Sequence, residues 1–342
     1  MQDAHDERQM KYFVTGATGF IGGRVARQLI EAGQQVISPV RTPAKAKDLA
    51  DLGVTVVQGD VTDKESMRQA MTGVDGVFHL AGWYKIGVKD KSMGVSINVD
   101  GTRNVLELMK ELNIAKGVYT STLAVNSDTH GRVFDESYRH EDDGHWVSEY
   151  DHTKWRAHYE VAEPMVKEGL PLVIVMPGLV FGPGDTSTIH ETFVQYLRRK
   201  LPMVPEKTTY CWAYVDDIAR GHILAMEKGK PGENYIIAGP VARVVDILAI
   251  AEKITGVPAP RLHPSLGTVR AMAAVMGMLE KVVPLPATYS AEGLRVITAT
   301  YLGSNEKAKR ELGYTLRPLE EGLRETLYYE MRQLGMQVPQ EG

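Results

Sequence analysis

Cysteine, long apolar runs and clustered positive charge are all scarce in this sequence of 342 residues. The single cysteine, Cys211, excludes an internal disulfide and fits a reducing cytoplasm. No apolar run reaches the ~18 to 20 residues that span a bilayer. The formal net charge is -4 and no stretch is strongly basic, so a nucleic-acid-binding surface is not expected. These absences predict a cytoplasmic protein with neither a membrane nor a nucleic acid as partner.

A secretion signal and a metal-binding motif are also missing. Residues 1–10, MQDAHDERQM, are polar and lack the apolar segment of a signal peptide, so we expect a disordered leader. The acidic stretch at 139–145 contains two histidines but no HExxH pattern or Cys/His ligand spacing. We interpret it as a solvated loop and predict no metal site.

The first half of the sequence alternates short β-branched runs with segments of helical spacing, which is typical of a parallel sheet flanked by helices. Strands are predicted at 12–14, 35–40, 54–58, 77–80, 117–121 and 172–176. Helices are predicted at 20–31, 63–71, 99–112 and 147–162, the second begun by a capping box of Thr62 and Glu65. The predicted fold class is α/β, a doubly wound parallel sheet.

The pattern changes after Pro177, where glycine and proline become frequent and the alternation stops. We assign residues 11–180 to the sheet domain and residues 181–342 mostly to a smaller, mixed domain that binds the substrate. One helix in the second half, at about 215–228, is expected to return to the sheet.

A glycine-rich turn, TGATGFIG at 15–22, lies between the first predicted strand and the first predicted helix. Gly16 permits a tight turn, Gly19 lets the backbone approach a pyrophosphate, and Gly22 allows the helix to pack on the strand. The start of the helix offers free N–H groups to the phosphates. The turn predicts a dinucleotide site of the Rossmann type, with contacts from Gly16, Thr18, Gly19, Phe20, Ile21 and Gly22. An ordinary tight turn is the alternative.

The end of the second strand indicates which dinucleotide is bound. A site for NAD carries a carboxylate there for the ribose 2′-hydroxyl, but this chain has Arg41 and no nearby acid. A guanidinium binds a 2′-phosphate in a forked geometry, so NADP(H) is favoured while NAD(H) stays open. A solvated surface arginine is the alternative. Asp60 could bind the adenine amino group or simply cap its own loop.

Tyr150 and Lys154 are four residues apart in a predicted helix and therefore share one face. A free tyrosine has a pKa of about 10, and a neighbouring ammonium lowers it, so we expect Lys154 to hold the Tyr150 pKa low. The phenol can then donate its proton to a developing alkoxide. Thr122, at the end of the fifth strand, offers a hydroxyl for the substrate oxygen.

These segments together resemble the extended short-chain dehydrogenase/reductase superfamily, also described as the NAD-dependent epimerase/dehydratase family. The resemblance covers most of the chain, through TGATGFIG (15–22), GD (59–60), HLAG (79–82), NVDGTRNVLE (98–107), YTST (119–122), YDHTK (150–154), PGLVFGPGD (177–185), YVDDIA (214–219) and KAKRELGY (307–314). The sequence looks most like the dihydroflavonol-reductase-like and hopanoid-associated sugar-epimerase-like subgroups.

The resemblance implies roles for individual residues. It implies a catalytic triad of Thr122, Tyr150 and Lys154, with Lys154 also bonding the nicotinamide ribose. The family usually has serine at the first position, so the choice between Ser121 and Thr122 stays open. Further cofactor contacts are implied at Asp60, Val61, Leu80, Ala81, Gly82, Pro177, Gly178 and Val180. A homodimer formed by the helices at 99–112 and 147–162 is implied as well.

Four more residues are candidates for the substrate pocket, together with Ser121, Thr122 and Tyr150. Trp83 and Tyr84 follow the carboxyl end of the fourth strand, where ligands bind in such sheets. His190 and Phe193 follow the change into the smaller domain. Simple packing is the alternative for Trp83 and Tyr84, and it is our interpretation of His79.

Three functions fit the sequence. The first is an NADP(H)-dependent oxidoreductase that reduces an aldehyde or ketone. The second is a nucleotide-sugar epimerase or dehydratase with tightly bound NAD(P), and the third is a non-catalytic dinucleotide sensor. Arg41 favours reduction, and Met176 and Leu179 stand where sugar-nucleotide members of the family usually carry arginine and asparagine. The sequence does not name the substrate.

Overall fold

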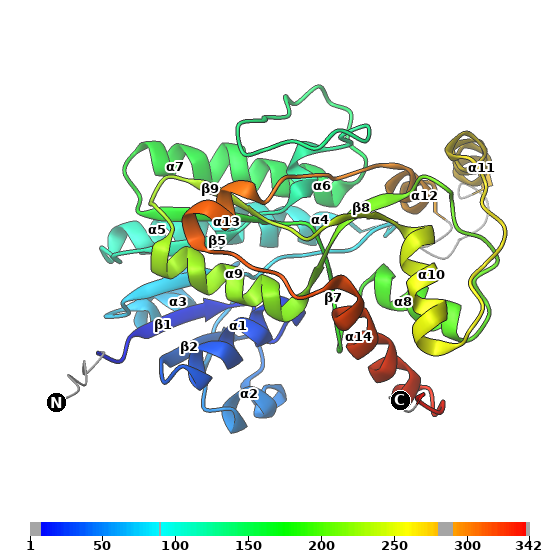
Figure 1. Cartoon of the computed structure of the whole chain (residues 1–342). Helices are drawn as coiled ribbons and strands as arrows, with labels where there is room; N and C mark the ends of the chain where they lie inside the picture. Colours follow the sequence, from blue (N-terminus) through cyan, green and yellow to red (C-terminus); the bar gives the residue numbers. More distant parts are fainter. Residues whose placement is uncertain (1–7, 89, 280–289, 340–342) are drawn as a thin grey trace.

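A seven-stranded parallel sheet forms the centre of the molecule, as a computed structural model shows (Figure 1). The structure describes residues 8–88, 90–279 and 290–339. The strand order is β3-β2-β1-β4-β5-β6-β9, and every neighbouring pair is parallel. The strands are β1 (Lys11–Thr15), β2 (Gln35–Val40), β3 (Thr55–Gln58), β4 (Gly76–His79), β5 (Gly117–Thr120), β6 (Leu172–Pro177) and β9 (Asn234–Ile237).

Helices cover both faces of this sheet. One layer contains α1 (Phe20–Glu31), α2 (Lys47–Asp51), α9 (Val215–Lys228) and α13 (Glu306–Leu312). The other contains α3 (Lys64–Met71), α5 (Gly101–Glu111) and the helical run formed by α6 (Glu149–Arg156), η4 (Ala157–Ala162) and α7 (Glu163–Lys167). α5 is itself preceded without a break by α4 (Ser92–Gly94) and η2 (Val95–Asp100), and η2 and η4 are both wound as π-helix.

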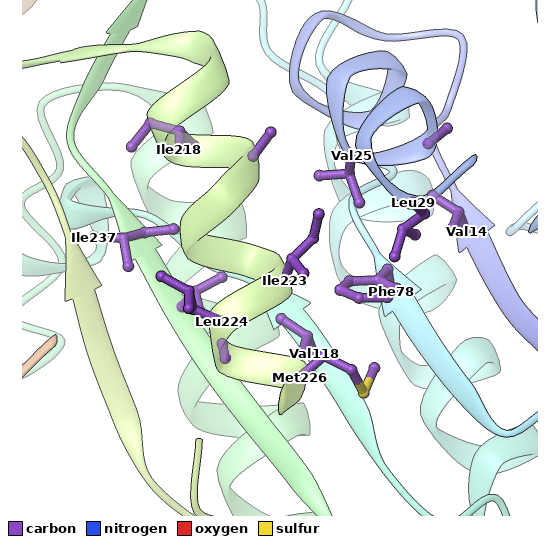
Figure 2. Packing of buried hydrophobic residues seen from close by; sticks show 14 of the residues in the cluster. Val14, Val25, Leu29, Phe78, Val118, Ile218, Ile223, Leu224, Met226 and Ile237 are labelled. Carbon is purple, nitrogen blue, oxygen red and sulfur yellow. The ribbon is translucent and has the colours of Figure 1, made fainter. Parts of the chain in front are cut away.

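Alternation along the strands builds the two hydrophobic layers. Val14 and Phe78 face the layer of α1 and α9, whereas Phe13 and Val77 face the layer of α3 and α5. Figure 2 shows the first layer, in which Val25 and Leu29 of α1 and Ile223 of α9 point at the strands. All of these side chains except Ile223 are at most 2% exposed.

The second half of the chain adds a smaller unit beside the carboxyl ends of the strands (Figure 1). Its three-stranded sheet has the order β10-β8-β7, with β7 and β8 parallel and β8 and β10 antiparallel. The strands are β7 (Leu179–Phe181), β8 (Thr209–Tyr214) and β10 (Val241–Arg243). The helices are α8 (Thr188–Leu197), α10 (Val244–Thr255), α11 (Leu266–Leu279), α12 (Ala291–Thr298) and α14 (Leu319–Gln333). Back in the first half of the chain, short 3-10 turns lie at η1 (Pro43–Lys45) and η3 (Leu123–Asn126).

The predicted fold class is confirmed, with small differences at individual elements. Helix α3 is capped by Asp63, whose side chain accepts from the Ser66 amide, so the predicted Thr62 capping box is wrong. The Thr62 hydroxyl instead donates to Asp60. Besides the expected α9, strand β9 and helix α13 also return to the large sheet.

The first residues that the structure describes, from Arg8 on, are bonded to residues beside the large sheet. Arg8 forms an ion pair of 2.9 Å with Asp75, and the Met10 amide donates to Gln34. The rest of the predicted leader, residues 1–7, lies outside the described residues. No helix in the described ranges is both long and apolar enough to cross a membrane.

Candidate active site

The glycine turn after β1 has the geometry that a dinucleotide needs. Gly16 adopts a positive φ of 76°, and a Cβ there would lie 2.7 Å from the Ala81 nitrogen. A Cβ on Gly22 would lie 2.2 Å from the Gly16 carbonyl oxygen, so a side chain would force α1 away from the strand. Gly19 precedes α1 without any side-chain cap. The first N–H groups of α1 therefore point outward for an anionic ligand, as a pyrophosphate requires.

The predicted cofactor residues follow the carboxyl ends of parallel strands, and these ends meet at one edge of the sheet. Leu80 and Ala81 follow β4, and both of their amides donate to the Thr15 hydroxyl at the end of β1. Val61 is buried against Gly101 in the turn after β3, and Gly82 is exposed. At the end of β6, Pro177 is buried, and a Cβ on Gly178 would lie 2.8 Å from the Cys211 carbonyl oxygen.

Thr18, Phe20, Ile21 and Val180 complete the predicted cofactor set. Thr18 is exposed in the glycine turn. Phe20, Ile21 and Val180 are half-buried and pack against the core of the smaller unit, so they lie where α1 meets that unit. The residues of this edge fit a dinucleotide, because the glycines leave room for its backbone contacts and the start of α1 supplies N–H donors.

Arg41 and Asp60 differ in how much of their hydrogen-bonding capacity the protein itself uses. Arg41 is exposed after β2 and forms no hydrogen bond or ion pair with any described residue. Asp60 is half-buried, and its Oδ1 atom accepts from both the amide and the hydroxyl of Thr62 at 2.9 Å. Asp60 therefore caps its own loop, as one of the two sequence interpretations stated.

Tyr150 lies in the first turn of α6, between Thr122 and Tyr84. Burial raises the pKa of the Tyr150 phenol above its ordinary value, and the hydrogen bond with the Thr122 side chain opposes that rise. The Tyr84 ring meets the Tyr150 ring edge-on, with centroids 4.8 Å apart. The phenol is therefore held in its protonated form beside a second hydroxyl.

Lys154 lies one turn further along α6 and is 5% exposed. Its ammonium donates to the Thr120 carbonyl oxygen at 2.7 Å and to the Tyr119 hydroxyl at 3.2 Å. Burial lowers the Lys154 pKa to about 7. In this structure the ammonium is engaged by β5 and burial raises the pKa of the phenol, so lowering of the Tyr150 pKa by Lys154 stays a prediction for the protein with its dinucleotide bound.

The two hydroxyls at the end of β5 point in different directions. Ser121 is 3% exposed, and its Oγ atom lies 2.7 Å from Nδ1 of His158 in the core. Thr122 accepts from the Ala124 amide and bonds the Tyr150 side chain. The structure therefore brings Thr122, and not Ser121, to the tyrosine.

His79 packs in the core beside this site. Its ring nitrogens lie 2.8 Å from the Thr15 hydroxyl and 3.0 Å from the Thr102 hydroxyl, and its ring stacks on Tyr119. Burial lowers its pKa to about 3, so the ring is neutral at physiological pH. It supports Tyr119, which in turn bonds Lys154.

A cavity of about 480 Å³ opens next to Tyr84 and reaches into the smaller unit. Its wall is largely aliphatic and aromatic, with Phe193, Trp212 and Leu248 among its residues. Among the described residues of the wall, Lys85 is the only basic one and Glu191 the only acidic one. Such a lining favours an uncharged, apolar ligand.

The four predicted pocket residues have different surroundings. Tyr84 and Phe193 line the cavity; Tyr84 keeps 43% of its surface exposed there, while burial of its hydroxyl raises its pKa to about 12. Trp83 packs against Gly94 instead, with its backbone held by Asn98. His190 faces Glu330 of α14, with Nδ1 3.0 Å from the carboxylate oxygen.

Several residues of the site carried no signal in the sequence. Thr188 bonds the Tyr84 hydroxyl, and α12 contributes Val296 and Ile297 to the cavity. These residues come from the irregular second half, where no motif marks them. Tyr119 lies within the YTST segment, so its position next to the site could have been inferred from the strand.

Fold and site together define a dinucleotide-dependent enzyme with a Thr-Tyr-Lys cluster at the edge of a Rossmann sheet. A family model described as "NAD dependent epimerase/dehydratase family" matches residues 12–238. The chain belongs to this family. It is an NAD(P)-dependent enzyme of the extended short-chain dehydrogenase/reductase type.

Two relatives and one solved structure show where the chain lies within the family. It is 32% identical to a putative dihydroflavonol 4-reductase of Synechocystis, over 93% of this chain and 94% of the relative. It is 27% identical to sterol demethylase protein B of Methylococcus capsulatus, over 89% of this chain and 93% of the relative. The crystal structure of gox2253 superposes with a TM-score of 0.83 at 30% identity, covering 96% of this chain and 100% of that one.

Proposed function

We propose that the protein is an NADP(H)-dependent reductase of an apolar aldehyde or ketone. The observation that carries this proposal is the position of the Tyr150 phenol, which lies beside the Thr122 hydroxyl and meets the Tyr84 ring at the cavity. A carbonyl carbon in the cavity mouth would have its oxygen within reach of both hydroxyls.

Thr122, Tyr150 and Lys154 have separate roles in the proposed reaction. The bound dinucleotide supplies the hydride. Thr122 donates a hydrogen bond to the substrate oxygen, and Tyr150 transfers its proton to that oxygen as negative charge develops there. Lys154, held by Tyr119 and the Thr120 carbonyl, fixes the polar side of the site and offers its ammonium to the cofactor ribose.

The cofactor preference rests on Arg41. Its guanidinium is exposed at the end of β2 and has no partner among the described residues. A 2′-phosphate would give it a charge-assisted, forked hydrogen bond, whereas the 2′-hydroxyl of NAD would find no carboxylate at that position.

The cavity wall supports reduction rather than sugar-nucleotide chemistry. A nucleoside diphosphate carries negative charge that needs cationic partners, and Lys85 is the only basic residue that the described part of the chain contributes to the wall. Met176, at 3% exposure, fills the position where an arginine would stand in sugar-nucleotide members. The names of two relatives, a putative dihydroflavonol 4-reductase and sterol demethylase protein B, also refer to ring compounds that are not nucleotide sugars.

Replacing Tyr150 with phenylalanine tests this proposal. Tyr150→Phe removes one hydroxyl and keeps the ring contact with Tyr84, so folding and NADPH affinity should be unchanged. Turnover of an accepted ketone should fall by roughly 10²–10⁴, which is the usual contribution of a positioned acid–base group. Steady-state kinetics on a panel of apolar aldehydes and ketones measures this, and near-wild-type turnover would contradict the proposal.

We also propose that the chain forms a homodimer through α5 and the run α6–η4–α7. The outward residues Arg103, Lys110 and Glu160 are exposed and polar, so such a pair would rest on charged contacts and weaken with salt. Light scattering at low and high salt tests this, and a monomer mass at micromolar concentration in both would contradict it.

A further inference from the structure

One carboxylate of the smaller unit bonds two parts of the site: the loop after β4, which lines the cavity, and helix α6, which carries Tyr150. Glu292, in the first turn of α12, is 7% exposed although it carries a carboxylate. Its Oε1 atom accepts from the Glu149 amide at 2.9 Å, and its Oε2 atom accepts from the Gly87 amide at 3.1 Å. The Lys91 ammonium lies 3.4 Å from the same Oε2 atom.

Each partner of Glu292 belongs to a different part of the site. Glu149 is the first residue of α6 and directly precedes Tyr150. Its amide is one of the four that a helix start leaves without an internal acceptor, and a carboxylate is favoured there by the helix dipole. The local cap, Ser148, accepts from the Asp151 amide instead. Glu292 therefore adds a second side-chain cap to α6 from 143 residues away.

Gly87 belongs to the loop that walls the cavity. Tyr84, Ile86 and Val88 of this loop line the cavity, and Tyr84 also contacts the Tyr150 ring. The helix that carries Glu292 lines the cavity too, through Gly293, Val296 and Ile297. The two oxygens of one side chain thus connect the substrate wall and the helix of the proton donor.

We infer that Glu292 is a positioning residue, which couples filling of the cavity to the placement of Tyr150. This inference rests on the proposed function, because it assigns Glu292 to the reduction carried out by that tyrosine. With both backbone bonds intact, a substrate that orders the loop also holds the start of α6. Without them, the loop and the helix respond to the substrate separately.

Three variants separate this role from general stability. Glu292→Ala removes both backbone bonds, and Glu292→Gln keeps one acceptor oxygen. Lys91→Met is the matched control, because it removes the ion pair and leaves both bonds. Small misplacement of a catalytic group is costly, so kcat per folded site should fall at least about tenfold for Glu292→Ala and about threefold for Glu292→Gln. Lys91→Met should stay within about twofold, and NADPH affinity, measured by fluorescence titration, should be unchanged in all three.

Amide hydrogen exchange gives a readout that does not need turnover. Peptides covering residues 84–91 and 148–153 should exchange faster in Glu292→Ala than in wild type. When the uncharged fluorescent probe N-phenyl-1-naphthylamine occupies the cavity, exchange should slow in both peptides of the wild type but only in 84–91 of Glu292→Ala.

Three results would overturn the inference. One is a Glu292→Ala kcat within twofold of wild type. Another is a loss of turnover fully explained by loss of folded protein, with NADPH affinity falling in parallel. The third is identical exchange of residues 148–153 in wild type and variant with the probe bound. If wild type reduces no carbonyl compound, the proposed function fails while the exchange experiment still decides the coupling.

Discussion

At the scale of single residues, the site depends on which hydroxyl meets Tyr150. The sequence predicts that a hydroxyl at the end of the fifth strand takes part, but it leaves Ser121 and Thr122 open, because both follow the same strand. The structure separates them by direction: Ser121 bonds His158 in the core, and Thr122 bonds Tyr150. Successive side chains on extended backbone point to opposite sides, and the sequence motif does not say which of the two faces the site.

Alanine substitutions at these two positions should therefore have different effects. Thr122→Ala should lower kcat, by less than Tyr150→Phe does, and should lower the free energy of unfolding by about 1 kcal/mol, because its hydroxyl also caps the turn at Ala124. Ser121→Ala should leave kcat nearly unchanged and lower the free energy of unfolding by about 1–3 kcal/mol, because the buried His158 nitrogen loses its partner. Paired kinetics and thermal unfolding measure both. The reverse pattern would show that Ser121 is the substrate hydroxyl.

The Arg41 side chain gives a second residue-scale prediction. Arg41→Ala should weaken NADPH binding by about 1.5–3 kcal/mol, the usual value of a hydrogen bond to a charged group, and should change NADH binding little. Fluorescence titration of both dinucleotides on both proteins measures this. A wild type that prefers NADH would refute the cofactor assignment.

At the scale of elements, the helices and strands of the first half could be predicted from its motifs and apolar spacing. The residues that cap its helices could be predicted less well. Helix α1 and strand β2 have the predicted bounds, because regular apolar spacing and the glycine turn define them. The helix at 147–162 was predicted as one element, whereas it is α6 followed by the π-helical η4. Local spacing also missed the cap at Glu292, since the contact joins segments far apart in the chain.

A buried carboxyl at the start of α6 makes the stability of this element depend on pH. Asp151 is 2% exposed and accepts from the hydroxyls of Ser148 and Tyr301. Burial raises its pKa from 3.8 to about 7. The folded state thus binds a proton that the unfolded state has lost. The contribution to stability is complete below the unfolded pKa and is lost as pH rises toward and through 7.

Asp151→Asn removes this titration. The difference in melting temperature, variant minus wild type, should increase from pH 5 to pH 8. Calorimetry at several pH values measures it, with Asp100→Asn, an exposed carboxylate, as the control. A difference that stays constant across this range would show that Asp151 keeps an ordinary pKa in the folded protein.

At the scale of the whole molecule, the sequence predicts the large sheet and leaves the substrate wall undefined. The parallel strands repeat one pattern, so the first half reveals its architecture. The cavity is assembled from the loop after β4, from α8, β8 and α10, and from α12. Because these segments are brought together only by folding, their shared lining could not be inferred from spacing, and neither could its apolar character.

The contacts of β9 and α13 with the large sheet could not be inferred from the sequence either, because they also join segments that only folding brings together. Strand β9 has only four residues and pairs with β6 in parallel, and Tyr314, just after α13, packs on the layer that contains α9. β3, β4 and β5 are equally short, but they lie in the first half, where strands alternate with helices, whereas β9 lies in the irregular second half, where that context is missing. The family match ends at residue 238, just after β9, so the matched part of the chain and the strands of the large sheet end together.

The most direct test of net reduction follows the hydride itself. The protein would be incubated with NADPH that carries deuterium at both C4 positions and an apolar ketone, with a nucleotide sugar in a parallel reaction. Our proposal predicts one deuterium per alcohol formed, stoichiometric loss of NADPH absorbance and no reaction of the sugar. Epimerisation of the nucleotide sugar with no net oxidation of the cofactor, and no deuterium in any alcohol, would contradict it.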